Sequence, residues 1–149
     1  MEEKEIYNLL KLIIHKLEGI DLKWRLDGSV NLLVQGIDLK PGDLDIATND
    51  KGLEVFSSHF DQFIVEEKLG VKFQGRTLLL KINELEVEIN SYEDSSLQKL
   101  DCVEHLSWRD LSLPVLPLKE AKKFYKKIER EKKVKMIVDK LKINQTEDE

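Results

Sequence analysis

The segment from Asp43 to Ala47 constrains this chain more than any other, because two aspartates alternate there with apolar residues. Successive side chains of a β-strand point to opposite faces, so Asp43 and Asp45 would share one face while Leu44 and Ile46 point into a core. Two carboxylates about 6.6 Å apart on one strand repel each other by roughly 2–3 kcal/mol at an effective dielectric constant of about 20. The pair therefore predicts a bound cation, and Mg²⁺ prefers oxygen ligands of this kind.

A third carboxylate is expected on a later strand, residues 85–90. Alternation there places Glu86, Glu88 and Asn90 on one face. We favour Glu88 as the third acid because apolar residues flank it on both sides, although Glu86 shares its face and remains a rival. If this strand lies beside the aspartate strand, the three carboxylates converge. Such a cluster can hold two metal ions, one that activates an attacking hydroxyl and one that stabilises a leaving pyrophosphate.

The dipeptide Gly28-Ser29 separates a predicted strand from a predicted short helix. A glycine followed by a helix start lets the backbone approach a phosphate closely, and the exposed N–H groups and the Ser29 hydroxyl would then bind it. The basic residues near this dipeptide are Lys23, Arg25 and Lys40, and we expect Arg25 and Lys40 to add nucleotide contacts. The sequence thus suggests a phosphate-binding element beside the acidic one.

Hydrophobic periodicity predicts the elements around these motifs. Apolar residues recur at helical spacing over residues 3–17, which predicts an amphipathic helix. Shorter helices are expected at 30–34 and 53–60, and two more after residue 118, with an interruption at 129–133. Strands are expected at 22–26, 43–47, 63–65, 76–82 and 85–90, whereas 91–118 receive no firm assignment. The predicted fold class is α/β (α+β), a small mixed β-sheet flanked by helices, with C-terminal helices.

Gly28-Ser29, a spacer of thirteen residues and Asp43-Leu44-Asp45 together resemble the signature of the DNA polymerase beta-type nucleotidyltransferase superfamily. Glu88 matches the family's third carboxylate by context. The residues nearest these motifs, Trp24 and Gly42 among them, are similar to small antibiotic-type and minimal nucleotidyltransferases. The resemblance covers about residues 20–140 and implies the nucleotidyltransferase fold.

The resemblance also implies an activity, the transfer of a nucleoside monophosphate from an NTP, with ATP expected, to a hydroxyl acceptor. Asp43, Asp45 and Glu88 would bind Mg²⁺, as two ions, and Glu88 would also act as the base toward the hydroxyl. Gly28 and Ser29 would hold the triphosphate. The acceptor stays open among an antibiotic, another small molecule, a protein hydroxyl and an RNA end. The alternative is an inactive module of the same fold that binds a partner protein, as an antitoxin does.

Composition bounds the remaining possibilities. The net charge of −5 is uneven, about −9 over residues 1–118 and +7 over 119–142. An acidic body disfavours broad nucleic-acid binding, and the basic stretch is read as a solvated face or as a lining of the acceptor cleft. One cysteine, Cys102, excludes an intrachain disulfide. We expect one domain over residues 1–142, its helical part starting near 118, a polar tail at 143–149, no membrane segment, a cytoplasmic location and no determined oligomeric state.

Overall fold

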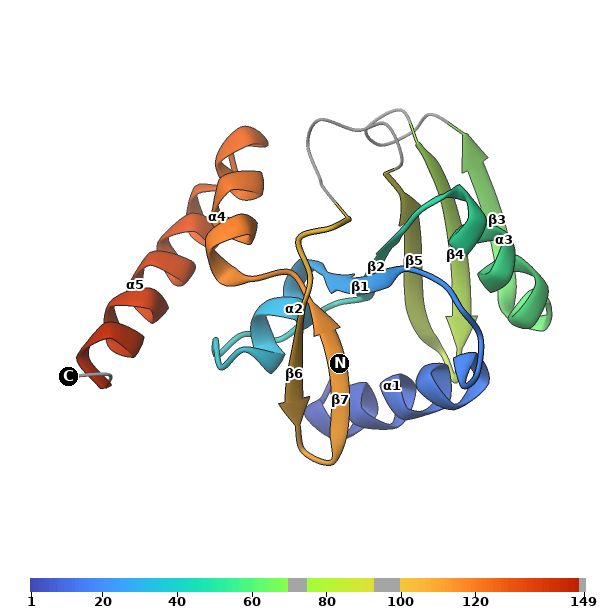
Figure 1. The fold of residues 1–149 in the computed structure, drawn as a ribbon, viewed down its shortest axis with the longest axis horizontal. Helices are drawn as coiled ribbons and strands as arrows, with labels where there is room; N and C mark the ends of the chain where they lie inside the picture. Colours follow the sequence, from blue (N-terminus) through green and yellow to red (C-terminus); the bar gives the residue numbers. More distant parts are fainter. Residues whose placement is uncertain (70–74, 93–99, 148–149) are drawn as a thin grey trace.

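The computed structural model describes residues 1–69, 75–92 and 100–147. A seven-stranded mixed sheet, ordered β3-β4-β5-β2-β1-β7-β6, forms its centre and helices flank it (Figure 1). The strands are β1 (Trp24–Asp27), β2 (Leu44–Thr48), β3 (Ile64–Leu69), β4 (Arg76–Ile82), β5 (Leu85–Ser91), β6 (Glu104–Trp108) and β7 (Leu111–Val115). The helices are α1 (Glu3–Leu17), α2 (Gly28–Val34), α3 (Asp50–His59), the 3₁₀ turn η1 (Asp61–Phe63), α4 (Leu118–Lys127) and α5 (Glu131–Glu147). Within these residues, no helix has both the length and the apolar character that crossing a bilayer requires. The mixed α/β class predicted from the sequence is confirmed.

The three central strands carry the polar residues of interest. Strand β2 runs parallel to β5 with Asp45 opposite Glu88, and it runs antiparallel to β1 with Asp27 opposite Asp45. The predicted alternation holds on β2, since Leu44 and Ile46 are fully buried. The strand starts one residue later than expected, which leaves Asp43 on the approach to it.

Helix α1 covers one face of the sheet, and its bounds confirm the prediction for residues 3–17. Glu2 and Glu5 form a capping box that satisfies backbone N–H groups at the helix start. The apolar stripe is buried in the main core with residues of the central strands. Its members are Ile6, Leu9, Leu10, Ile13 and Leu17. Burying each such side chain contributes about 1.5–3 kcal/mol, so the stripe fixes the helix on the sheet.

Helices α4 and α5 pack into a second core cluster with residues of α2. Asn31 ties the two parts together: its amide donates to the carbonyl of Leu116, and its side-chain oxygen accepts from the N–H of Leu116, both at 2.9 Å. The break between α4 and α5 is shorter than predicted and centres on Glu129, which has a φ of 58°. Helix α5 then continues to Glu147, so the segment predicted to be a polar tail is helical up to that residue.

The hairpin β6–β7 occupies part of the stretch that received no assignment. Pro114 lies inside β7, and a proline normally argues against a central strand because it cannot donate to the ladder. Strand β3 is longer than the predicted 63–65. The prediction missed its second half because the charged residues there lie on an exposed edge strand and show no apolar alternation. Helix α2 starts at Gly28, two residues before the predicted start at residue 30, and Asp27 occupies the N-cap position.

Candidate functional site

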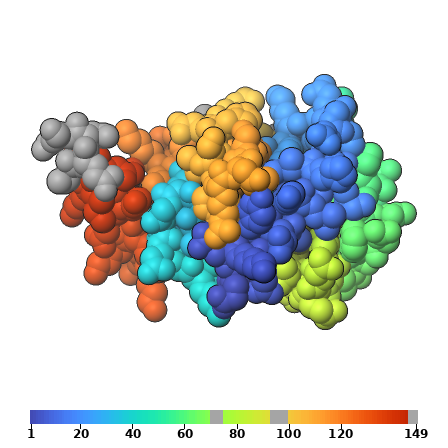
Figure 2. Space-filling view, turned by 90° about the horizontal axis from the view of Figure 1, so that it is seen from below, coloured from blue at the N-terminus to red at the C-terminus, as the bar shows by residue number. Residues whose placement is uncertain are grey.

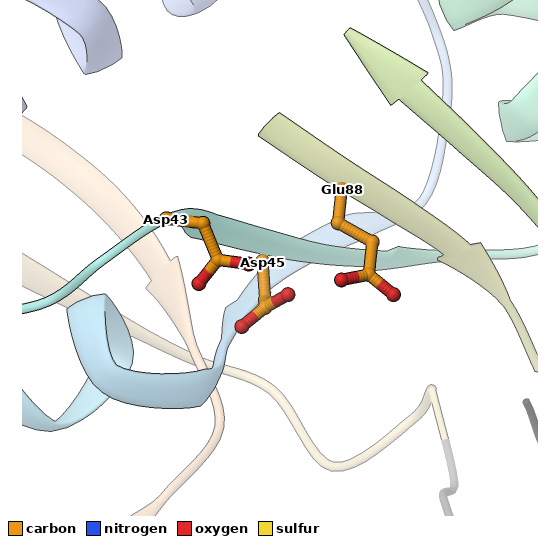
Figure 3. Close-up of side chains that lie close together, drawn as sticks. All are labelled: Asp43, Asp45 and Glu88. Carbon is orange, nitrogen blue, oxygen red and sulfur yellow. The ribbon is translucent and has the colours of Figure 1, made fainter. Parts of the chain in front are cut away.

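The three predicted acids meet at one point of the sheet (Figure 3). Asp43, Asp45 and Glu88 each offer a carboxylate oxygen, and these oxygens all lie within 4.8 Å of one another. Glu88 is buried and the two aspartates are partly buried. Glu86 is exposed and lies opposite Lys81 in the register of the β4–β5 hairpin. The acid that joins the aspartates is therefore Glu88, and Glu86 is not part of this cluster.

Gly28 lies directly against the acid cluster. Its φ of 65° is in the left-handed region, which glycine adopts without steric cost. A Cβ atom built on Gly28 would overlap Oδ2 of Asp45. The backbone can approach the carboxylate this closely only because the side chain is absent, so the glycine fixes the distance between α2 and β2.

A cavity of about 300 Å³ opens above the acids. The sheet and α2 supply one wall, which includes Ser29, Asn90 and Tyr92 as well as the three acids. The C-terminal helices supply the opposite wall with Phe124, Tyr125, Ile128, Arg130 and Lys133. Negative charge thus faces positive charge across a partly apolar cavity. This arrangement suits a ligand that carries anionic groups and a bound cation together.

Lys133 links the two walls. Its Nζ atom donates a hydrogen bond of 2.7 Å to Oγ of Ser29. Partial burial, and next the charge of Arg130, lower the pKa of Lys133, while Asp45 and Asp43 act in the opposite direction. The dipeptide predicted to bind phosphate therefore already has a cationic neighbour from α5.

Comparison with known proteins identifies the fold that carries this site. No protein-family model and no curated protein matches the sequence. Among solved structures, a candidate nucleotidyltransferase from Thermotoga maritima aligns with a TM-score of 0.76 and 22% identity, over 95% of this chain and 96% of that one. The chain has the nucleotidyltransferase fold.

Two proteins whose names refer to antibiotics share that fold. The lincosamide antibiotic adenylyltransferase LnuA, solved with lincomycin, aligns with a TM-score of 0.62 and 14% identity, over 92% of this chain and 96% of LnuA. The antibiotic-resistance factor ANT(2'')-Ia aligns with a TM-score of 0.70 and 10% identity, over 94% of this chain and 86% of that one. The second factor has also been solved with adenylyl-2''-tobramycin.

Arg25 is not placed where the sequence suggested. Its side chain is fully buried, and its Nε lies 3.3 Å from Oδ1 of Asp27. A second guanidinium nitrogen donates to the carbonyl of Cys102 at 3.3 Å. Arg25 is not among the residues that line the cavity. Alternation puts Arg25 on the same face of β1 as Asp27, but its guanidinium is held in the interior by Asp27 and the Cys102 carbonyl, and only Asp27 reaches the cavity.

Lys40 also lies outside the cavity. It is exposed and forms a 2.7 Å ion pair with Glu2, and this hydrogen bond, followed by the charge of Glu2, raises the pKa of Lys40. The loop that carries it leads from α2 toward Pro41, whose carbonyl accepts a hydrogen bond from the N-terminal ammonium at 2.6 Å. Lys40 is near Gly28-Ser29 in the sequence, but it does not line the cavity.

Several cavity residues were not identified from the sequence. Asn90 could have been, since alternation puts it on the Glu88 face. Asp27 precedes Gly28 directly, and its carboxylate reaches the cavity from β1. Arg130 and Lys133 belong to the basic stretch that the sequence offered as a possible lining of the acceptor cleft, but no local pattern singled them out. Lys133 reaches the site because α5 packs near α2.

The tyrosines of the cavity stay protonated. Burial raises the pKa of Tyr92 strongly, and the nearby charges of Asp27, Asp45 and Glu88 raise it further. Burial, together with the charges of Asp27 and Asp45, likewise raises the pKa of Tyr125. Each hydroxyl therefore keeps its proton at neutral pH and can act as a hydrogen-bond donor in a cavity rich in acceptors.

Proposed function

We propose that the protein transfers a nucleoside monophosphate from an NTP to a hydroxyl group and releases pyrophosphate, with Mg²⁺ as the metal. The observation that carries this proposal is the convergence of Asp43, Asp45 and Glu88 within 4.8 Å, inside a cavity that also contains Arg130 and Lys133. ATP is the expected nucleotide, because adenylyl transfer is named for structural neighbours. Phosphoryl-type transfer depends mainly on positioning and charge stabilisation, which such a cavity provides.

The acid cluster has the composition of a magnesium site. Three carboxylates supply only hard oxygen donors, and their close spacing is repulsive unless a cation lies between them. When bound, Mg²⁺ stabilises negative charge that develops on phosphate oxygens. Asp43 and Asp45 would hold the metal. Glu88, the most buried of the three, would share that role and accept the proton of the attacking hydroxyl.

The triphosphate would bind along the α2–α5 side of the cavity. Gly28 brings the backbone close to Asp45, and the Ser29 hydroxyl already meets an ammonium group from Lys133. In place of Arg25 and Lys40, we assign the cationic contacts to Arg130 and Lys133, because both line the cavity. Charge-assisted hydrogen bonds from such groups to phosphate are about twice as strong as neutral ones.

The acceptor would be a small molecule that carries a hydroxyl group. Supporting this class, two of the structural neighbours are named for or were solved with small antibiotics. The alternative, an inactive module that binds a partner protein, differs from this proposal in one respect. Such a module needs neither nucleotide nor metal.

The decisive experiment measures pyrophosphate release from ATP and Mg²⁺ across a panel of hydroxyl compounds, with lincosamides and aminoglycosides included. Turnover should disappear in Asp43→Asn and in Asp45→Asn while the circular dichroism spectrum stays unchanged. Asp38→Asn is the matched control, since Asp38 is exposed and lies outside the cavity. Unchanged turnover in both site variants would falsify the proposal. Calorimetry that detects neither nucleotide nor Mg²⁺ binding to the wild type would instead support the binding module.

A further inference from the structure

A second groove, of about 890 Å³, runs along α5 and the end of α4. It adjoins the acid cavity, and both are lined by Tyr125 and Arg130. Helix α5 forms the outer end of the molecule in Figure 1, and Figure 2 shows it at the surface. The α5 residues that line the groove are Glu131, Val134, Lys135, Val138, Asp139 and Lys142. Val134 and Val138 are only partly buried, so one face of the helix keeps apolar surface in contact with solvent.

The spacing of the groove residues on α5 is symmetric. Four of these residues lie at intervals of four, three and four: Glu131, Lys135, Val138 and Lys142. Such spacing places them on one stripe of the helix. The same intervals are obtained when the stripe is read backward. A second copy of α5 running antiparallel can therefore lie along the first with matching positions opposite each other.

The order of charges favours that antiparallel pairing. It puts Glu131 opposite Lys142 of the second copy at both ends of the contact. In the middle, the aliphatic stem of Lys135 meets Val138 of the second copy, and its ammonium group can reach Asp139 one position further on. A parallel arrangement would instead place Glu131 against Glu131 and Lys142 against Lys142, and opposed like charges disfavour association.

We infer that the protein forms a homodimer in which the two α5 helices pair antiparallel about a two-fold axis. The interface is isologous, because the same stripe contributes to both sides. It borders the acid cavity through Tyr125 and Arg130. The inference does not depend on nucleotide transfer, since it concerns the outer face of α5.

Charge reversal tests the pairing by sedimentation velocity over a range of protein concentrations. Wild type should be a dimer. Glu131→Lys and Lys142→Glu should each raise the dimer dissociation constant by about tenfold or more, because each puts like charges together twice. An equimolar mixture of the two variants should regain wild-type dimer stability, since both contacts then join opposite charges. Lys51→Glu, on α3 at the other end of the molecule, makes the same charge change as Lys142→Glu and should have no effect.

Restoration in the mixture distinguishes contact between chains from contact within one. Residues 131 and 142 are about 16.5 Å apart along the helix, from the rise of 1.5 Å per residue, so they cannot pair in the same copy. A wild type that stays monomeric at all concentrations overturns the inference. So does a dimer that either single variant leaves unchanged, or a mixture that remains as weak as its components.

Discussion

Lys133 on α5 donates a 2.7 Å hydrogen bond to Ser29 in the first turn of α2, across 104 positions of sequence. The contact joins the C-terminal helices to the edge of the acid cavity. Both partners are groups that bind phosphate well, an ammonium and a hydroxyl beside a glycine. Through this one bond, the basic end of the chain becomes part of a site whose acids come from the central sheet.

Replacing Lys133 by Met keeps an unbranched side chain as long as the aliphatic stem of Lys and removes the ammonium group. If Lys133 binds the triphosphate, the KM for ATP should rise about tenfold to a hundredfold, which corresponds to the 1.5–3 kcal/mol of a hydrogen bond to a charged group. Lys132→Met is the control, because Lys132 is exposed and does not line the cavity. Steady-state kinetics in which both variants give the same KM would contradict the assignment of Lys133.

Glu88 and Glu86 offer a matched pair on one face of β5. Ligands that bind only the folded state stabilise it, so Mg²⁺ should raise the melting temperature of the wild type. Glu88→Gln should lose that rise, and its turnover should fall about 10²- to 10⁴-fold through loss of the base. Glu86→Gln should keep both. The measurement is differential scanning fluorimetry with Mg²⁺ and with EDTA, and equal behaviour of the two variants would exclude a special role for Glu88.

The acid cluster could be anticipated because strand periodicity is a local property. Alternation alone put Leu44 and Ile46 in the core and Asp45 on the face that Glu88 also occupies. The basic side of the cavity could be anticipated only as one of two interpretations of the whole basic stretch, because no single residue stood out. Nothing within α5 says that Lys133 meets Ser29, because that contact depends on how two helices pack. For Arg25, proximity in sequence was misleading, because its guanidinium is fully buried and pairs with Asp27 instead of lining the cavity.

Asp27 should make the stability of the metal-free protein depend on pH. Burial raises the pKa of Asp27 from 3.8 to about 6, although the charge of Arg25 opposes the shift. In the unfolded chain the carboxyl ionises near pH 4, so the folded state binds more protons between about pH 4 and 6. The free energy of unfolding should therefore fall as pH rises through this window, by up to about 3 kcal/mol, and this contribution should then level off.

Asp27→Asn isolates this contribution from the other acids. Urea unfolding in EDTA at several pH values should show the variant gaining stability relative to the wild type between pH 4 and 7. The free-energy difference between the two proteins should be constant above about pH 7, where Asp27 is ionised in both states. A difference that does not change with pH would mean that burial leaves the carboxyl of Asp27 unperturbed.

Alanine substitutions at Gly28 and Gly19 separate the effect of a strained backbone from the effect of a new contact with the acid cluster. Both have a positive φ, 65° and 77°, so alanine at either position should cost about 1–2 kcal/mol of stability. Only at Gly28 does the new Cβ meet another group, Oδ2 of Asp45; at Gly19 no atom lies within 4 Å. Gly28→Ala should therefore displace Asp45 and lose Mg²⁺-dependent turnover, whereas Gly19→Ala should lose stability alone. Urea unfolding and pyrophosphate release measure the two effects separately, and equal turnover in both variants would show that the close approach of Gly28 to Asp45 is not needed for the reaction.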